Sequence, residues 1–152
     1  MKLTDILVRK ACIVEMQAKT KKDALQELAV GLARHTSGLD ERELLGLLLE
    51  REKLGTTGMG DGIAIPHARI ESLDRLVANF GRSGSGIEFD SVDGKQAHLF
   101  FLMVAPGREG SAHLLTLAKL SRLLSEAQFR ARLQELESVD ELFRVVEEAE
   151  SG

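Results

Sequence analysis

The strongest structural signal in the chain is the segment Ala97-His98-Leu99-Phe100-Phe101-Leu102-Met103-Val104-Ala105. Its apolar residues occupy both alternating sets of positions, so a strand formed here has two faces to bury. Such a strand lies in the middle of a sheet with helices on each side. The uncharged run ends at Pro106 and is about half of the roughly 20 residues that a membrane-spanning helix needs. We therefore expect a central strand and no direct membrane insertion.

Patterns on either side of this segment predict the other elements. Each expected helix begins with a Ser, Thr or Asp that can cap free N–H groups, followed by an apolar stripe at helical spacing. Runs of apolar and β-branched residues predict the strands. The expected helices begin at Thr20, Asp40, Ser111, Ser125 and Ser138, and the further expected strands cover residues 10–16, 63–66 and 76–80.

The order of these elements predicts the fold class. Along the chain it is β-α-α-β-β-β-α-α-α, which suits one mixed sheet of four to five strands between two helical layers. We therefore expect an α/β protein (α+β in some classifications) built as a three-layer α/β/α sandwich. No repeat or long linker divides the sequence, so residues 1–152 are expected to form a single domain.

The composition limits the possible binding partners and the cellular compartment of the protein. The net charge of −4, with scattered Lys and Arg, argues against nucleic acid as a partner. Cys12 is the only cysteine, which excludes an intramolecular disulfide and a cysteine-based zinc site and fits a reducing cytosol. Charges interrupt the apolar residues near the N-terminus, so no secretory signal is evident. We expect a cytoplasmic protein.

A glycine-rich stretch, residues 55–67, reads Gly-Thr-Thr-Gly-Met-Gly-Asp-Gly-Ile-Ala-Ile-Pro-His. Glycine admits positive φ and close approach of a ligand, and successive inward-turned N–H groups can hold an anion. Pro66 is expected to end the preceding strand, so His67 would point into the space where open sheets bind ligands. The alternative is a surface loop histidine without chemistry. The predicted phosphate loop consists of Gly58, Gly60, Asp61 and Gly62.

Two further residues indicate an anion site. His113 lies in the first turn of a predicted helix, near free N–H groups, and faces inward. Arg51 shares a helix face with Leu48, where a charge is expected only if an anion meets it, and its planar fork of donors fits phosphate. The alternatives are a structural half-buried His113, and an Arg51 that reaches solvent or pairs with Glu50 or Asp61.

The other two histidines are expected to be structural. His35 lies near a predicted helix end, where a cation interacts favourably with the helix dipole. His98 begins the central strand and is expected to be a strand-edge or core residue.

Together, His67, His113 and Arg51 favour a phosphohistidine site. A neutral imidazole can attack phosphorus without a general base, while arginine and N–H donors stabilise the transferring oxygens. This chemistry requires no metal and no cofactor. The glycines lack the Lys-Ser/Thr ending of a Walker motif, are not spaced as a dinucleotide fingerprint and precede a strand, so a nucleotide site is not expected.

Residues 51–69, Arg-Glu-Lys-Leu-Gly-Thr-Thr-Gly-Met-Gly-Asp-Gly-Ile-Ala-Ile-Pro-His-Ala-Arg, closely resemble a known active-site signature. It is that of the fructose/mannitol/nitrogen class of enzyme IIA proteins in the bacterial phosphoenolpyruvate-dependent phosphotransferase system. The resemblance implies a single EIIA type-2 domain with the family's three-layer fold. The one departure is Ala68, where many members have glycine, and a methyl group fits there if φ is negative.

The resemblance also implies roles and partners. His67 matches the histidine that accepts a phosphoryl group on Nε2 from a histidine phosphocarrier protein (HPr/NPr-like). His113 matches a second histidine that supports the group, and Arg51 matches an arginine of the pocket.

The sequence is compatible with three functions. A chain without attached IIB, IIC or carrier domains resembles the nitrogen-regulatory branch, whose members bind regulatory target proteins according to their phosphorylation state. The alternative within the family is a sugar-specific, fructose/mannitol-type IIA component that passes the phosphoryl group to a IIB domain. Outside the family, the glycine loop could serve an anion-binding module that transfers nothing.

Overall fold

The computed structural model describes residues 2–107 and 111–152, with the side chains of residues 111 and 112 left out. Within these ranges no helix is both long enough and apolar enough to cross a membrane. The elements are α1 (Leu3–Ile6), the 3₁₀ helix η1 (Arg9–Ala11), α2 (Lys21–Arg34), α3 (Glu41–Lys53), β1 (Gly58–Gly60), β2 (Ile63–Ala64), β3 (His67–Ile70), β4 (Val77–Ile87), β5 (Ala97–Pro106), α4 (Ser111–Leu124), α5 (Ala127–Gln134) and α6 (Val139–Ser151).

Strand β5 is the centre of the sheet, as its sequence predicts. Strands β2 and β3 pair with successive stretches of one edge of β5, both in parallel, and β4 pairs antiparallel along β5. Strand β1 adds an antiparallel partner to β2. The sheet is therefore mixed and five-stranded, which confirms the expected sheet.

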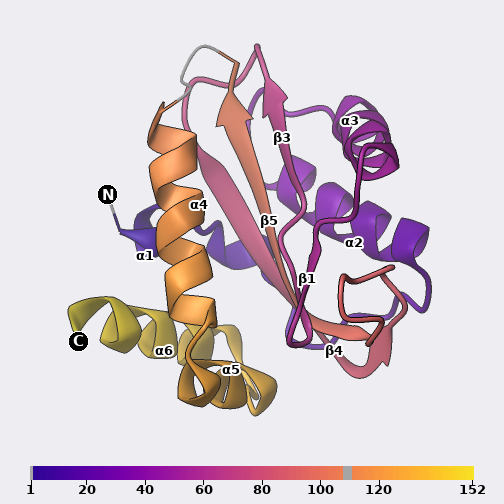
Figure 1. Cartoon of the computed structure of the whole chain (residues 1–152). Helices are drawn as coiled ribbons and strands as arrows, with labels where there is room; N and C mark the ends of the chain where they lie inside the picture. Colours follow the sequence, from indigo (N-terminus) through magenta and orange to yellow (C-terminus); the bar gives the residue numbers. More distant parts are fainter. Residues whose placement is uncertain (1, 108–110) are drawn as a thin grey trace.

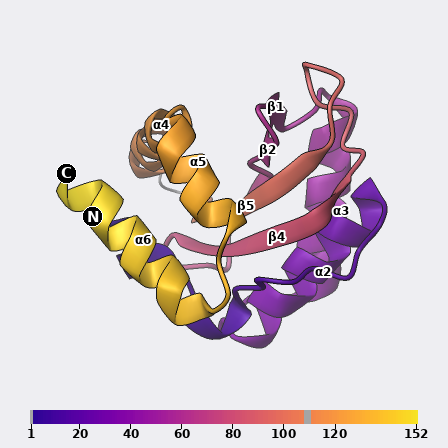
Figure 2. The same ribbon diagram turned by 90° about the horizontal axis from the view of Figure 1, so that it is seen from below.

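Helices cover both faces of this sheet (Figures 1 and 2). Phe101 and Met103 of β5 point to one face and pack with α1, α4, α5 and α6, while Phe100 and Leu102 point to the other and pack with α2 and α3. The side chains alternate because a strand turns successive residues to opposite faces. The apolar residues on both faces of β5 thus explain the two helical layers, and the predicted mixed α/β fold is confirmed.

Three of the predicted helix starts carry the expected caps. In each, the capping oxygen accepts the backbone N–H three residues later, at 2.8 to 3.2 Å. These bonds satisfy N–H groups that have no partner inside the helix. The pairs are Thr20 with Asp23, Asp40 with Glu43, and Ser138 with Glu141.

One predicted start is wrong and one is only partly described. Helix α5 begins at Ala127 after Glu126, because the Ser125 hydroxyl donates to the Arg122 carbonyl at the end of the preceding helix. Helix α4 does begin at Ser111, but a cap from that side chain lies outside the described residues.

The strand predicted over residues 10–16 is not regular. The chain forms a 3₁₀ turn at Arg9–Ala11 and then an isolated parallel bridge between Ile13 and Gly81 of β4. Ile13 still donates to Phe80 at 2.8 Å and accepts from Arg82 at 2.9 Å. The tight turn interrupts the ladder, so the segment follows β4 without becoming a continuous strand.

The strand predicted over residues 63–66 is shorter than expected, but the chain continues to pair with β5 beyond it. Pro66 lacks an N–H and breaks the ladder after β2, yet its carbonyl accepts from Met103 N at 3.0 Å and keeps the chain beside β5. Pairing resumes at once as β3, so the expectation that the strand ends before His67 is wrong. Strand β4 likewise extends beyond the predicted 76–80.

Candidate active site

His67 is the first residue of β3, and its imidazole is oriented by the break that precedes it. Its Nδ1 lies 2.9 Å from the carbonyl oxygen of Ile65. Because a carbonyl oxygen only accepts hydrogen bonds, Nδ1 carries the proton in this arrangement and Nε2 keeps its lone pair. The half-buried ring therefore presents an unprotonated nitrogen.

His113 lies beside this ring although it is distant in sequence. The two ring centroids are 5.5 Å apart with planes tilted by 51°. His113 is 5% exposed, and its Nδ1 has no hydrogen-bond partner among the described residues. Burial lowers the pKa of His113, and the nearby charges of His67 and Arg69 lower it further. His113 is therefore neutral near pH 7 and has a polar atom free for a ligand.

Arg51 completes the trio predicted from the sequence. It lies in the last turn of α3, where its Nη1 donates to the Gly55 carbonyl at 2.8 Å. Within residues 2–107 and 111–152 it forms no ion pair, so neither Glu50 nor Asp61 neutralises it, and Glu50 pairs with Lys53 at 3.1 Å instead. The guanidinium retains donors for an anion.

A single cavity of about 430 Å³ brings these three side chains together. Ala68, whose φ is not positive, forms part of its wall, so the methyl group at this position fits as expected. The lining residues are Leu47, Glu50, Arg51, Leu54, His67, Ala68, Arg69 and His113. The combination of two imidazoles and two guanidinium groups suits a phosphoryl group.

Arg69 is a lining residue that the sequence reasoning did not assign. On a strand, residues two apart share a face, so Arg69 lies on the same face of β3 as His67. The alternation of side chains along a strand predicts this position of Arg69 only if the strand continues past Pro66. The strand was expected to stop before His67.

The predicted phosphate loop is not brought to the cavity. Gly60, Asp61 and Gly62 have positive φ and form the turn between β1 and β2. This turn precedes Ile63, which lies four positions before His67, or roughly 13 Å along the sheet. The Asp61 N–H already donates to the Asp93 carboxylate at 3.1 Å, and that of Gly58 to the Thr56 hydroxyl at 2.9 Å. The turn therefore does not line the cavity of His67, and a part for it in holding a phosphoryl group stays a prediction.

The remaining histidines lie outside the cavity. His35 follows the last residue of α2 and is exposed. His98 is half-buried on β5, with Nδ1 at 3.0 Å from the Ser83 carbonyl. The described residues contain no cluster of three His, Cys, Asp or Glu suited to a metal ion.

Comparison with known proteins shows the family of the chain. Residues 6–149 match the family model "Phosphoenolpyruvate-dependent sugar phosphotransferase system, EIIA 2". The chain is 38% identical over 146 residues to a nitrogen regulatory protein of Bradyrhizobium diazoefficiens, covering 96% of this chain and 95% of that protein. It is 34% identical to the fructose-specific EIIABC component of Bacillus subtilis, covering 96% of this chain and 23% of that protein.

A solved structure supports the same relationship. The nitrogen regulatory protein IIA-Ntr of Neisseria meningitidis superposes with a TM-score of 0.88 at 32% identity, covering 93% of this chain and 97% of that one.

Proposed function

Since the chain belongs to the EIIA 2 family of the phosphoenolpyruvate-dependent sugar phosphotransferase system, we propose that it carries a phosphoryl group on Nε2 of His67. The observation that carries this proposal is the hydrogen bond from His67 Nδ1 to the Ile65 carbonyl, which leaves Nε2 as the nucleophile. The family match over residues 6–149 supports a single EIIA 2 domain across 1–152.

The transfer step follows from this tautomer. The Nε2 lone pair attacks phosphorus while the bond from phosphorus to the donor nitrogen breaks. The donor ring, protonated on its other nitrogen, takes that electron pair and leaves as a neutral imidazole. Positive charge develops on the His67 ring as the new bond forms, and the Ile65 carbonyl stabilises it through the Nδ1 proton. Exchange between two imidazole nitrogens requires no metal and no cofactor.

The surrounding side chains stabilise the transferring group. Arg51 and Arg69 direct positive charge to its oxygens, which is where most phosphoryl-transfer catalysis lies. A neutral His113 donates one hydrogen bond without adding a charge that would compete with the arginines for the oxygens. In this proposal Arg51 and His113 have the roles that the family resemblance implies.

The donor in this proposal is a histidine phosphocarrier protein (HPr/NPr-like). Two large apolar side chains of the cavity lining lie exposed, Leu54 with 85% and Leu47 with 37% of its surface. An apolar surface around a half-buried nucleophile suits a protein donor, which must exclude water from both histidines during transfer.

The output in this proposal is regulatory: regulatory target proteins bind or release the domain according to its phosphorylation state. The relatives named nitrogen regulatory protein are matched over nearly their full length, which favours this reading. The alternative, a sugar-specific IIA component that passes the group to a IIB domain, draws on the similarity to the fructose-specific component. Transfer of label to a IIB domain together with restored sugar uptake would favour the alternative.

The test is phosphorylation in a reconstituted system. The protein is incubated with phosphoenolpyruvate, enzyme I and a histidine phosphocarrier protein, and its intact mass is followed. We expect the gain of one acid-labile phosphoryl group in the wild type and in the His35→Ala control, and none in His67→Ala. Full phosphorylation of His67→Ala would refute the assignment, and no phosphorylation of the wild type would favour a non-transferring anion-binding module.

A further inference from the structure

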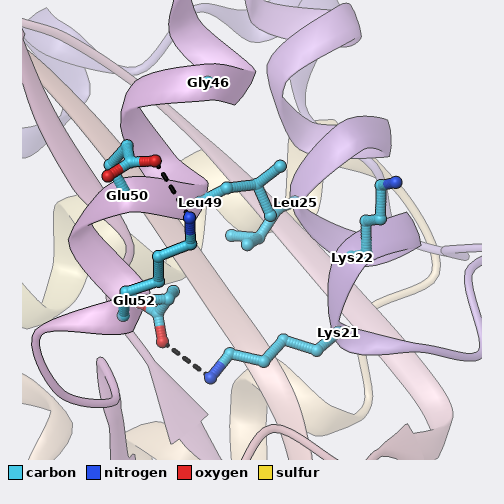
Figure 3. Close-up of a pocket in the computed structure, with 8 residues that line it drawn as sticks. Lys21, Lys22, Leu25, Gly46, Leu49, Glu50 and Glu52 are labelled. Atoms are coloured by element: carbon cyan, nitrogen blue, oxygen red, sulfur yellow. Dashed lines mark hydrogen bonds and ion pairs between the residues drawn. The ribbon is translucent and has the colours of Figure 1, made fainter.

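Glu52 is a buried carboxylate at the end of α3, one residue after Arg51. Its side chain is 7% exposed and forms an ion pair with Lys21 at the start of α2, with Nζ 2.9 Å from Oε1 (Figure 3). A negative charge near a helix C-terminus is unfavourable, and burying a carboxylate costs free energy unless it is fully paired. Helix stability therefore does not account for glutamate at this position.

The same carboxylate holds the chain that leaves α3. The Thr57 backbone N–H donates to Glu52 Oε1 at 3.1 Å, and the Thr57 hydroxyl donates to Oε2. Thr57 is itself buried, so these bonds are formed away from water. The bonds to Lys21 and Thr57 together provide the Glu52 carboxylate with its partners. The two bonds from Thr57 in turn fix the position of Thr57.

From Thr57 the contacts continue to the nucleophile. The Thr57 carbonyl accepts the N–H of Ile65 at 3.0 Å, just beyond the pairing of β1 with β2. Pro66 restricts Ile65 to extended conformations. Because the Thr57 carbonyl also holds the Ile65 N–H, the Ile65 carbonyl can point in only a few directions. That carbonyl accepts the proton of His67 Nδ1.

We infer that Glu52 is a positioning residue for His67: through Thr57 and Ile65 it holds the carbonyl that keeps the proton on Nδ1 and the lone pair on Nε2. The same carboxylate anchors the last turn of α3 and so the backbone of Arg51, which brings the nucleophile and the guanidinium to one cavity. The predicted effect on phosphoryl transfer rests on the proposed function, whereas the effect on the His67 tautomer does not.

The test measures the tautomer directly. Nitrogen-15 NMR of the imidazoles distinguishes a protonated nitrogen from one with a lone pair, at about pH 8.5, two units above the ordinary histidine pKa of about 6.5. We expect wild-type His67 to be protonated on Nδ1, and Glu52→Gln and Thr57→Val to give a mixture of tautomers. The rate of phosphorylation should fall about tenfold to a hundredfold in both variants, because small displacements of a reacting group cost this much.

Two matched variants separate positioning from general stability. Thr57→Ser keeps the hydroxyl and should restore both tautomer and rate. Glu27→Gln changes another helical glutamate that accepts backbone N–H groups, those of Gln17 and Ala18. Glu27 does not line the cavity, so this variant should change neither.

Two outcomes would overturn the inference. One is a wild-type tautomer in both Glu52→Gln and Thr57→Val, with rates within about twofold of wild type. Another is failure of Thr57→Ser to restore the tautomer, because packing of the methyl group would then be responsible. If Glu52→Gln does not fold, the two Thr57 variants decide. A wild-type protein that accepts no phosphoryl group would refute the proposed function and leave the tautomer result to stand alone.

Discussion

Replacing Arg51 by alanine should slow phosphorylation of His67 by about a hundredfold. The guanidinium faces the cavity with one N–H held by the Gly55 carbonyl, so its other donors are free for the phosphoryl oxygens. Loss of one preorganised transition-state donor costs about 10²-fold or more in rate, and a hundredfold corresponds to about 2.7 kcal/mol in the activation barrier. Arg51→Lys keeps the charge but loses the planar fork, so we expect about a tenfold loss.

The effect on folding should be much smaller than the effect on rate. The variant loses one hydrogen bond to Gly55, worth about 1 kcal/mol, and a cation at the C-terminus of α3, worth about 0.3 to 1 kcal/mol. The free energy of unfolding should therefore fall by about 1 to 2 kcal/mol. A domain of ordinary stability, with a free energy of unfolding of about 5 to 15 kcal/mol, stays folded after such a loss. The lost rate therefore cannot be attributed to unfolded protein.

The assay is the time course of intact mass after mixing with a phosphorylated histidine phosphocarrier protein. Arg34→Ala is the matched control, because Arg34 lies in the last turn of α2, is exposed and does not line the cavity. An Arg51→Ala rate within about threefold of both wild type and control would refute a role for Arg51 in transfer and leave it a structural residue.

Two predictions concern stability. Burial lowers the pKa of His113 below its ordinary value of 6.5, so the unfolded chain binds a proton on this ring before the folded protein does, and the free energy of unfolding falls as pH drops below about 6.5. Urea titrations should show a smaller fall in His113→Leu, and an unchanged slope would contradict the burial argument. Phe101→Ala should lose about 3 to 5 kcal/mol, because this buried ring packs against Phe80 at 5.0 Å between centroids; Phe101→Leu should lose clearly less.

Local patterns predicted the elements whose signals lie within a few residues. The apolar run at residues 97–105 identified the central strand, because a strand buried on both faces has no polar alternation. Thr20, Asp40 and Ser138 identified helix starts because a cap bonds to an N–H only three residues away. Ser125 is not the cap of α5: its hydroxyl donates to the carbonyl of Arg122 at the end of α4, and Glu126 stands at the start of the helix.

Other outcomes depended on a distant strand. Pro66 suggested the end of a strand, but β5 supplies Met103 N as a donor to the Pro66 carbonyl and continues the pairing into β3. The glycine turn suggested an anion site beside His67, but its place in the β1–β2 hairpin puts it at another part of the sheet, where the Asp61 N–H meets Asp93.

By itself, the sequence determined most of the helices, the central strand, the two-sided core and the residue types of the site, because periodicity, caps and side-chain chemistry are local properties. Only the tertiary structure decided which of those residues meet. Sheet register and helix packing bring Arg51, His67 and His113 to one cavity and add Arg69 to it. They also form the series of hydrogen bonds that runs from Glu52 through Thr57 and Ile65 to the proton on Nδ1 of His67. No spacing within the sequence specifies this series.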